Sequence, residues 1–309
     1  MTCAHTLHLR GIIVRQITLA PDRAPAHAPQ LAGDRALRLF CRPDLSRLGP
    51  DGHAQLAAKA RPALRRAAFS WTPSSVGDLA TYVFAPKSPP VGTVLCVHGW
   101  SGEAAFMAAF SGPLVHSGLR VVLFDNPAHG RSGGRRSSII EMARATLAVA
   151  DRFGPIDTVI AHSVGCFATL LALEGGPPLG RHHPFEKLCL IAAPNHFGDV
   201  VHRFADQIDL PPAARRCFER GVARASQRTL RELNAADFLR KLGVPTLLVH
   251  ARDDDCIPVA DGAAIAAVCP NARLKVFDGL GHGRVLYAPP VIREVRSFAL
   301  TSLYRAAAE

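Results

Sequence analysis

Residues 158–173 read TVIAHSVGCFATLLAL, and the prediction of the fold begins from this stretch. An apolar run with β-branched residues passes through Ser163 into a run of small and apolar residues typical of a helix. Ala161 and Gly165 stand two positions before and two after this serine. A nucleophile on a tight strand-to-helix turn needs small residues there, because larger ones would crowd the backbone. The helix N-terminus also favours a developing negative charge. The pentapeptide alone is equally compatible with a serine that caps the helix and a glycine that packs.

Short apolar runs alternate with helical stretches on both sides of this turn, from about residue 68 onward. The later runs are apolar throughout, as expected for parallel strands buried on both faces. This alternation predicts a doubly wound α/β fold with a mostly parallel sheet. The expected strands are 68–72, 79–84, 93–98, 120–125, 158–162, 188–193, 246–251 and 273–278. The expected helices are 103–117, 138–153, 164–174, 258–268 and 289–307, and Ser138 with Glu141 forms a capping box at the second.

Two parts of the chain fall outside this alternation. Residues 195–243 read as helices and are too long for one crossover, so we expect a small helical cap over the sheet. We expect residues 1–67 to form a partly disordered N-terminal leader with short helices, and residues 68–309 to form the α/β domain that carries the cap. Within the leader, Asp34 is expected to cap a short helix that Pro43 ends.

A second glycine-rich motif, HGWSG, begins at His98 and follows the strand expected at 93–98. Ligands collect at this end of parallel strands, and glycine-rich backbone can direct an amide group toward a developing oxyanion. We assign the N–H groups of Trp100 and Val164 as the two donors of an oxyanion hole. His98 could act as a ligand or a base, but a structural role in fixing the loop is favoured.

An acidic loop and a histidine loop complete the set of motifs. HARDDDCIP (250–258) follows one strand and GLGHG (279–283) follows the next, so a serine, an acid and a histidine each follow a strand, in that order. With HGW, DNPAHGRS and AHSVG, these motifs make residues 68–305 resemble the α/β-hydrolase superfamily. Ala161 stands where the family more usually has glycine, and HAR replaces HGR. Both departures are minor.

This resemblance implies a catalytic triad. Ser163 corresponds to the nucleophile, His282 to the general base and then acid, and Asp254 to the residue that orients the histidine. The family spacing selects Asp254 among three adjacent aspartates, and His129 corresponds to a structural turn. The resemblance implies a serine hydrolase that cleaves carboxylic esters through an acyl-enzyme, without a cofactor. A serine nucleophile argues against the dehalogenase and epoxide-hydrolase relatives, which use aspartate.

The same machinery leaves other reactions open. A thioesterase or a hydrolase of esters linked to an acyl carrier is the main alternative, and C–C-bond hydrolases, peptidases and acyltransferases use the same groups. Residues 195–243 carry eight arginines and Lys241 against six acidic residues. This charge suits anionic acyl groups or an acidic carrier protein, and a solvated helical face explains it equally well. A non-catalytic binding protein on the same scaffold normally lacks a triad member, whereas all three are present.

Composition and the absence of certain motifs limit the cofactors and partners that the protein is expected to have. The 309 residues include 36 basic and 25 acidic ones, a net charge of +11. Residues 1–90 hold +7 of this charge, which we attribute to a solvated leader rather than to nucleic-acid binding. The chain has no HxH, HExxH or CxxC pattern, no P-loop and no GxGxxG after a strand, so we expect no metal and no cofactor.

Membrane and compartment signals are also absent from the sequence. No apolar run reaches 18 residues, which predicts no membrane span. Several cysteines lie inside apolar runs, as expected for small core residues in a reducing compartment. We therefore expect a cytoplasmic enzyme that acts on a small-molecule ester or acyl substrate. Nothing in the sequence indicates the oligomeric state.

Overall fold

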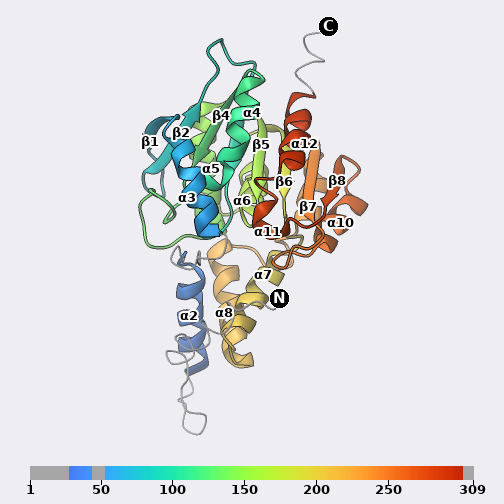
Figure 1. Cartoon of the computed structure of the whole chain (residues 1–309). Helices are drawn as coiled ribbons and strands as arrows, with labels where there is room; N and C mark the ends of the chain where they lie inside the picture. Colours follow the sequence, from blue (N-terminus) through green and yellow to red (C-terminus); the bar gives the residue numbers. More distant parts are fainter. Residues whose placement is uncertain (1–27, 44–52, 302–309) are drawn as a thin grey trace. The chain divides into compact units, whose positions relative to one another are not determined.

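The computed structural model describes residues 28–43 and 53–301 (Figure 1). The chain forms two compact units. The sheet unit comprises Pro43–Asn195 and Ala235–Glu309, and the helical unit comprises Met1–Arg42 and His196–Asn234. The part of the predicted leader before residue 28 lies outside the described residues.

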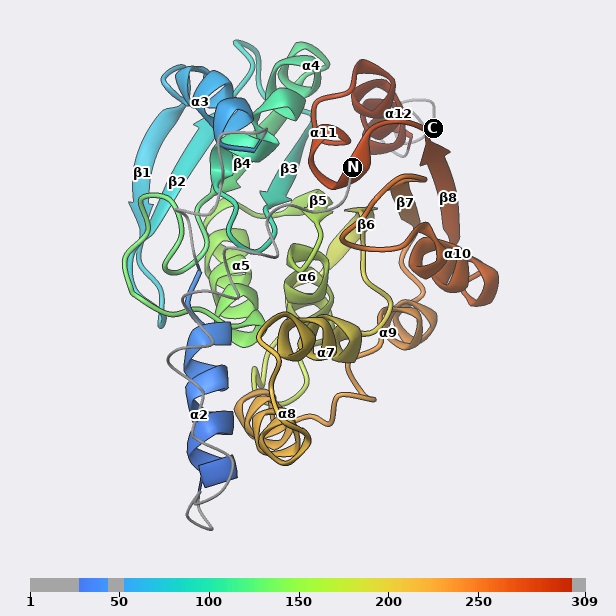
Figure 2. The same ribbon diagram turned by 60° about the horizontal axis from the view of Figure 1, so that its bottom comes forward.

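The sheet unit is built on an eight-stranded sheet with the order β1-β2-β4-β3-β5-β6-β7-β8, as Figure 2 shows. The pairs β1–β2 and β2–β4 are antiparallel, and the remaining pairs are parallel. The predicted mostly parallel α/β fold is therefore confirmed, and each expected strand is present. The strands are β1 (Ala68–Thr72), β2 (Leu79–Phe84), β3 (Gly92–Val97), β4 (Leu119–Phe124), β5 (Ile156–His162), β6 (Phe185–Ile191), β7 (Thr246–Ala251) and β8 (Ala272–Phe277).

The strand order reverses beside β3, because β4 lies on one side of it and β5 on the other. Parallel strands place their carboxyl ends at one edge of the sheet, and the crevice at such a reversal is where α/β proteins bind ligands. The segments that follow β3, β5, β7 and β8 carry the five predicted site residues. The topology therefore brings all five to the same edge.

Helices cover both faces of the sheet. Alternate strand residues such as Val94 and Cys96 pack with η3, α4 and α12 in one hydrophobic core. On the other face α5, α6, α9 and α10 contact one another in that order, and Figure 2 shows α5 and α6 opposite α4 and α12. The helices of this unit are α3 (His53–Leu64), η3 (Ala104–Phe110), α4 (Ser111–His116), α5 (Ile139–Phe153), α6 (Gly165–Glu174), α9 (Ala235–Leu242), α10 (Val259–Val268), α11 (Gly281–Arg284) and α12 (Pro289–Leu300).

Local sequence signals set two of the helix boundaries. The N-cap half of the predicted capping box is confirmed at α5, where the Ser138 hydroxyl accepts the Glu141 N–H at 3.2 Å. The single helix predicted over 103–117 instead begins as the 3₁₀ helix η3 and continues as α4. Pro113 accounts for the break, because it cannot donate to the preceding turn and is tolerated only in the first turn of a new helix.

The helical unit differs from the predicted cap in its boundaries. It joins α7 (Phe197–Gln207) and α8 (Pro212–Ser226) to α2 (Ala28–Phe40) from the predicted leader. The helix α9, which we expected in the cap, belongs to the sheet unit. The predicted cap at Asp34 is wrong, because α2 begins at Ala28 and the Asp34 carboxylate accepts a hydrogen bond from Gln30 within the helix.

Close packing explains why α2 belongs to this unit. A Cβ added at Gly33 would lie 2.6 Å from the Cys217 Cβ of α8, so the two helices approach at a glycine. At the end of α2, the Phe40 ring packs edge-on against three phenylalanines. Its centroid lies 6.1 Å from that of Phe197, 5.1 Å from Phe204 and 5.5 Å from Phe218. Such aromatic contacts join segments that are far apart in the sequence.

In the part of the chain that the structure describes, no helix combines the length and the apolar character needed to cross a bilayer.

Candidate active site

Ser163 lies on a tight turn between β5 and α6. Its φ of 52° is in the left-handed region, which a residue with a side chain adopts only at a cost. Its N–H donates to the Ile191 carbonyl at 2.9 Å, which holds the turn. Gly165 is small for a steric reason, because a Cβ there would lie 2.6 Å from the His98 carbonyl oxygen. The predicted strand–turn–helix geometry is therefore present.

Three predicted site residues meet at this turn. His282, on α11, places its Nε2 3.1 Å from the Ser163 Oγ. Its Nδ1 lies 2.9 Å from Oδ2 and 3.1 Å from Oδ1 of Asp254, which follows β7. The serine hydroxyl can donate to one ring nitrogen while the other donates to a carboxylate. This is the arrangement of an activated nucleophile, a base and an orienting acid.

The Asp254 carboxylate is held in a fixed position and in its charged form. Its Oδ1 accepts the backbone N–H groups of Cys256 at 2.9 Å and Ile257 at 2.8 Å. Burial raises the pKa of this carboxyl group, but hydrogen bonds and charge interaction with His282, together with the two N–H groups, outweigh it and leave the pKa below its usual value. A charged carboxylate therefore faces the imidazole ring.

The neighbouring aspartates point to other partners. Asp253 Oδ1 accepts the N–H of Leu280 at 3.0 Å, which ties the loop after β7 to the loop after β8. Asp255 is exposed, and its Oδ1 lies 3.5 Å from the Cys256 Sγ. Of the three adjacent aspartates, Asp254 is the one whose carboxylate meets His282.

The loop after β3 passes directly beside the serine. A Cβ on Gly99 would lie 2.9 Å from the Ser163 Cβ, so the loop can approach only because this residue is glycine. Trp100 follows Gly99 in the loop, and Val164 is the N-cap residue of α6. N–H groups at a helix start precede the helical hydrogen bonds and are available to a ligand. Both predicted oxyanion donors are thus chain neighbours of residues in close contact at the turn.

Two buried histidines hold the loop after β3. His98 Nδ1 donates to the Gly99 carbonyl at 2.7 Å, and its Nε2 accepts the Asn126 N–H at 2.9 Å. His129 Nε2 accepts the Ser101 N–H at 3.1 Å. Burial lowers the pKa of His98 to about 3 and that of His129 to about 4, so both rings are neutral at pH 7. These contacts match the structural roles predicted for both residues.

Two sets of buried polar contacts near the site were not predicted from the sequence. His162 Nε2 donates to the His282 carbonyl oxygen at 3.0 Å, and the two ring centroids lie 4.7 Å apart. Asp125 accepts the N–H groups of Ala104 at 2.7 Å and Arg131 at 2.9 Å, which connects the loops after β3 and β4. Both residues lie inside quoted motifs, but their partners are not encoded locally.

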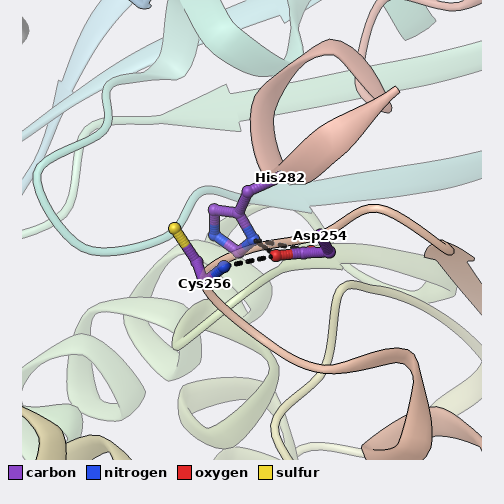
Figure 3. Close-up of side chains that lie close together, drawn as sticks. All are labelled: Asp254, Cys256 and His282. Atoms are coloured by element: carbon purple, nitrogen blue, oxygen red, sulfur yellow. Dashed lines mark hydrogen bonds and ion pairs between the residues drawn. The ribbon is translucent and has the colours of Figure 1, made fainter. Parts of the chain in front are cut away.

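One group of three side chains in the described part of the chain could hold a metal ion. Asp254, Cys256 and His282 each offer one ligand atom, and these atoms lie within 4.8 Å of one another (Figure 3). Cys256 comes from the same loop as Asp254, and its side chain is exposed. No local metal-binding spacing relates these three residues, so the sequence predicted no metal site here.

A family model described as Alpha/beta hydrolase family matches residues 94–295 of this chain. The match begins in β3, ends in α12 and therefore includes the five predicted site residues. It covers well over half of the chain.

Two curated relatives show different kinds of likeness. A non-heme haloperoxidase from Rhodococcus erythropolis is 42% identical over 67 residues, which cover 20% of this chain and 24% of that protein. The chain therefore matches about a quarter of the length of that relative. A monoacylglycerol lipase from Mycolicibacterium smegmatis is 26% identical over 241 residues, which cover 65% of this chain and 84% of the lipase.

Solved structures share the fold. Est1E from Butyrivibrio proteoclasticus, solved with ferulic acid bound, aligns with a TM-score of 0.57 at 17% identity. The alignment covers 78% of this chain and 100% of that one. An esterase from Thermogutta terrifontis aligns with a TM-score of 0.55 at 17% identity, over 77% of this chain and 99% of that one. At this identity the likeness establishes the fold alone.

Proposed function

This chain belongs to the alpha/beta hydrolase family, and we propose that it is a serine hydrolase that cleaves carboxylic esters through an acyl-enzyme. The observation that carries the proposal is the continuous set of contacts from Ser163 to His282 at 3.1 Å and from His282 to Asp254 at 2.9 Å. A structural serine at a helix start would require neither a ring nitrogen at its hydroxyl nor a buried carboxylate behind that ring.

In the first half of the proposed reaction, Ser163 Oγ attacks the ester carbonyl carbon. The His282 Nε2 takes the hydroxyl proton as the C–O bond forms, and Asp254 stabilises the resulting imidazolium. The N–H groups of Trp100 and Val164 donate to the oxyanion of the tetrahedral intermediate. When the intermediate collapses, His282 gives its proton to the departing alcohol and the acyl group remains on Ser163.

The second half releases the acid. A water molecule gives a proton to His282 Nε2 and attacks the acyl carbonyl, and the same oxyanion donors stabilise the second intermediate. Collapse returns the proton to Ser163 Oγ and frees the carboxylic acid. The held position of Asp254 supports both halves, because its two backbone donors keep the carboxylate aligned with the ring.

A substrate panel tests this proposal. Nitrophenyl esters of increasing acyl length, with acyl-CoA thioesters alongside, should give turnover by the wild-type protein and none above background by Ser163→Ala. Faster turnover of thioesters than of matched oxygen esters would favour a thioesterase. Equal turnover by the two proteins on every substrate would contradict a serine mechanism.

A second candidate function is haloperoxidase activity, favoured by the 42% identity over 67 residues to the Rhodococcus erythropolis protein of that name. The same acyl-enzyme would yield a peracid if hydrogen peroxide took the place of water, and a peracid oxidises bromide. Bromination of a phenolic dye in acetate with hydrogen peroxide tests this candidate. It should depend on Ser163, and bromination at the same rate by Ser163→Ala would exclude it.

A further inference from the structure

We propose that Asp254, Cys256 and His282 form a zinc-binding site that inhibits the enzyme. Their three ligand atoms lie within 4.8 Å of one another. Figure 3 shows the Cys256 thiol and the Asp254 carboxylate close to the His282 ring, which is carried by α11. Zinc binding itself is independent of the proposed function, whereas the inhibition rests on the proposed serine mechanism.

The donor set selects zinc among the common divalent ions. A thiolate, an imidazole and a carboxylate are its usual protein ligands, at about 2.3 Å for sulfur and about 2.0–2.2 Å for nitrogen and oxygen, with water as a fourth ligand. Mg²⁺ and Ca²⁺ prefer oxygen ligands, so a thiolate disfavours them. Tetrahedral zinc with these bond lengths holds its ligand atoms roughly 3.3–3.6 Å apart, so ligand atoms that now lie up to 4.8 Å apart must approach by as much as about 1.5 Å. The exposed Cys256 side chain can supply this by rotating about a single bond.

The surrounding charge and rigidity also favour a cation. Cys256 directly follows three aspartates, and Arg252 on the same loop is engaged by the Asp278 carboxylate at 2.7 Å. The Asp254 carboxylate is already held by two backbone N–H groups, so one ligand is fixed before the ion arrives. Clustered carboxylates attract divalent cations to the loop.

Zinc at this site would stop the proposed reaction. Asp254 faces Nδ1 of His282, so a zinc ion that shares this carboxylate binds Nδ1 in place of the hydrogen bond between them. The ring proton then stays on Nε2, which can no longer accept the Ser163 proton. The thiol proton of Cys256 leaves to solvent, the imidazole binds as a neutral ring, and no oxidant or reductant is required.

Equilibrium dialysis of the freshly reduced full-length protein against Zn²⁺ tests binding without any need for activity. The wild-type protein should retain zinc at micromolar concentration, and Cys256→Ser should bind it at least tenfold more weakly, since even outer-shell changes cost 10–100-fold. Cys41→Ser is the matched control, because Cys41 is a partly exposed cysteine of the helical unit and should leave zinc binding unchanged. Zinc should also slow the alkylation of Cys256 by iodoacetamide, measured by mass spectrometry.

Ester hydrolysis at increasing Zn²⁺ then tests the inhibition, with each variant compared with its own metal-free rate. Half-inhibition of Cys256→Ser should require at least tenfold more zinc than that of the wild-type or Cys41→Ser protein, and Mg²⁺ should not inhibit. Equal zinc affinity of wild-type and Cys256→Ser proteins overturns the site, and zinc binding without inhibition overturns its inhibitory role. A protein with no hydrolase activity on any substrate would refute the proposed function and leave the dialysis result standing.

Discussion

Replacement of Asp254 by asparagine tests the proposed triad with the least change in shape. The carboxylate Oδ1 accepts two backbone N–H groups, from Cys256 at 2.9 Å and Ile257 at 2.8 Å. The amide oxygen of Asp254→Asn should stay with these donors, which directs the amide NH₂ toward His282 Nδ1. That nitrogen would have to accept a hydrogen bond instead of donating one. The ring proton then sits on Nε2, the atom 3.1 Å from Ser163 Oγ, and the base is lost.

The expected loss is large because the substitution has two effects. It leaves the His282 ring in a tautomer that cannot act as the base, and it removes the carboxylate charge that stabilises the imidazolium. The same substitution in chymotrypsin-type proteases lowers kcat by about 10⁴, which corresponds to about 5.5 kcal/mol in the activation barrier. We expect a fall of about 10³–10⁴ in kcat for Asp254→Asn. The measurement is kcat on the best nitrophenyl ester of the panel, with thermal unfolding to establish that the variant is folded.

The adjacent aspartates provide matched controls. Asp253 accepts the Leu280 N–H at 3.0 Å, and Asp255 is exposed beside the Cys256 thiol. Asp253→Asn and Asp255→Asn should each lower kcat less than about tenfold, because neither removes the partner of the imidazolium. A larger loss at either control than at Asp254, or a folded Asp254→Asn protein within tenfold of the wild type, would refute the reasoning.

Three further predictions concern the nucleophile, the pH dependence of stability and the helical unit. A fluorophosphonate probe should label the wild-type protein and not Ser163→Ala, by mass spectrometry; labelling that persists in the variant would contradict the assignment. Burial lowers the pKa of His98 to about 3 and of His129 to about 4, so below about pH 6.5 the unfolded chain binds protons that the fold does not, and stability falls as the pH falls. The slope of unfolding free energy against pH, from urea titrations between pH 4.5 and 6, should be shallower in His129→Asn by about 1 kcal/mol per pH unit; an unchanged slope would show that His129 titrates normally. Phe40→Ala should destabilise the helical unit by roughly 2–4 kcal/mol, because Phe40 packs against three other phenylalanine rings, and limited proteolysis within residues 196–234 should become faster; cleavage at the wild-type rate would argue against this packing.

Several features of this protein follow from local sequence alone. The apolar runs predict β3 to β7, because strands covered on both faces are rich in apolar residues. The small residues around Ser163 predict the strand–turn–helix geometry, although the contact that keeps Gly165 small is tertiary, since an added Cβ would lie 2.6 Å from the His98 carbonyl oxygen. The N-cap at Ser138 is local, because its hydroxyl accepts the N–H of a residue only three positions later. The order of motifs along the chain was enough to place Ser163, Asp254 and His282 at one sheet edge.

Other features depend on contacts between segments that are far apart in the sequence. The union of α2 with α7 and α8 depends on a helix contact at Gly33 and on the Phe40 ring, and helical periodicity specifies neither partner. The hydrogen bond from His162 to the His282 carbonyl and the approach of Cys256 to the His282 ring join segments that the chain path brings together. Periodicity and capping act over one or two turns of the backbone, whereas these contacts depend on how distant segments pack. For that reason the three residues of the proposed triad were predictable from the order and spacing of their motifs, but the thiol beside them became visible only in the folded chain.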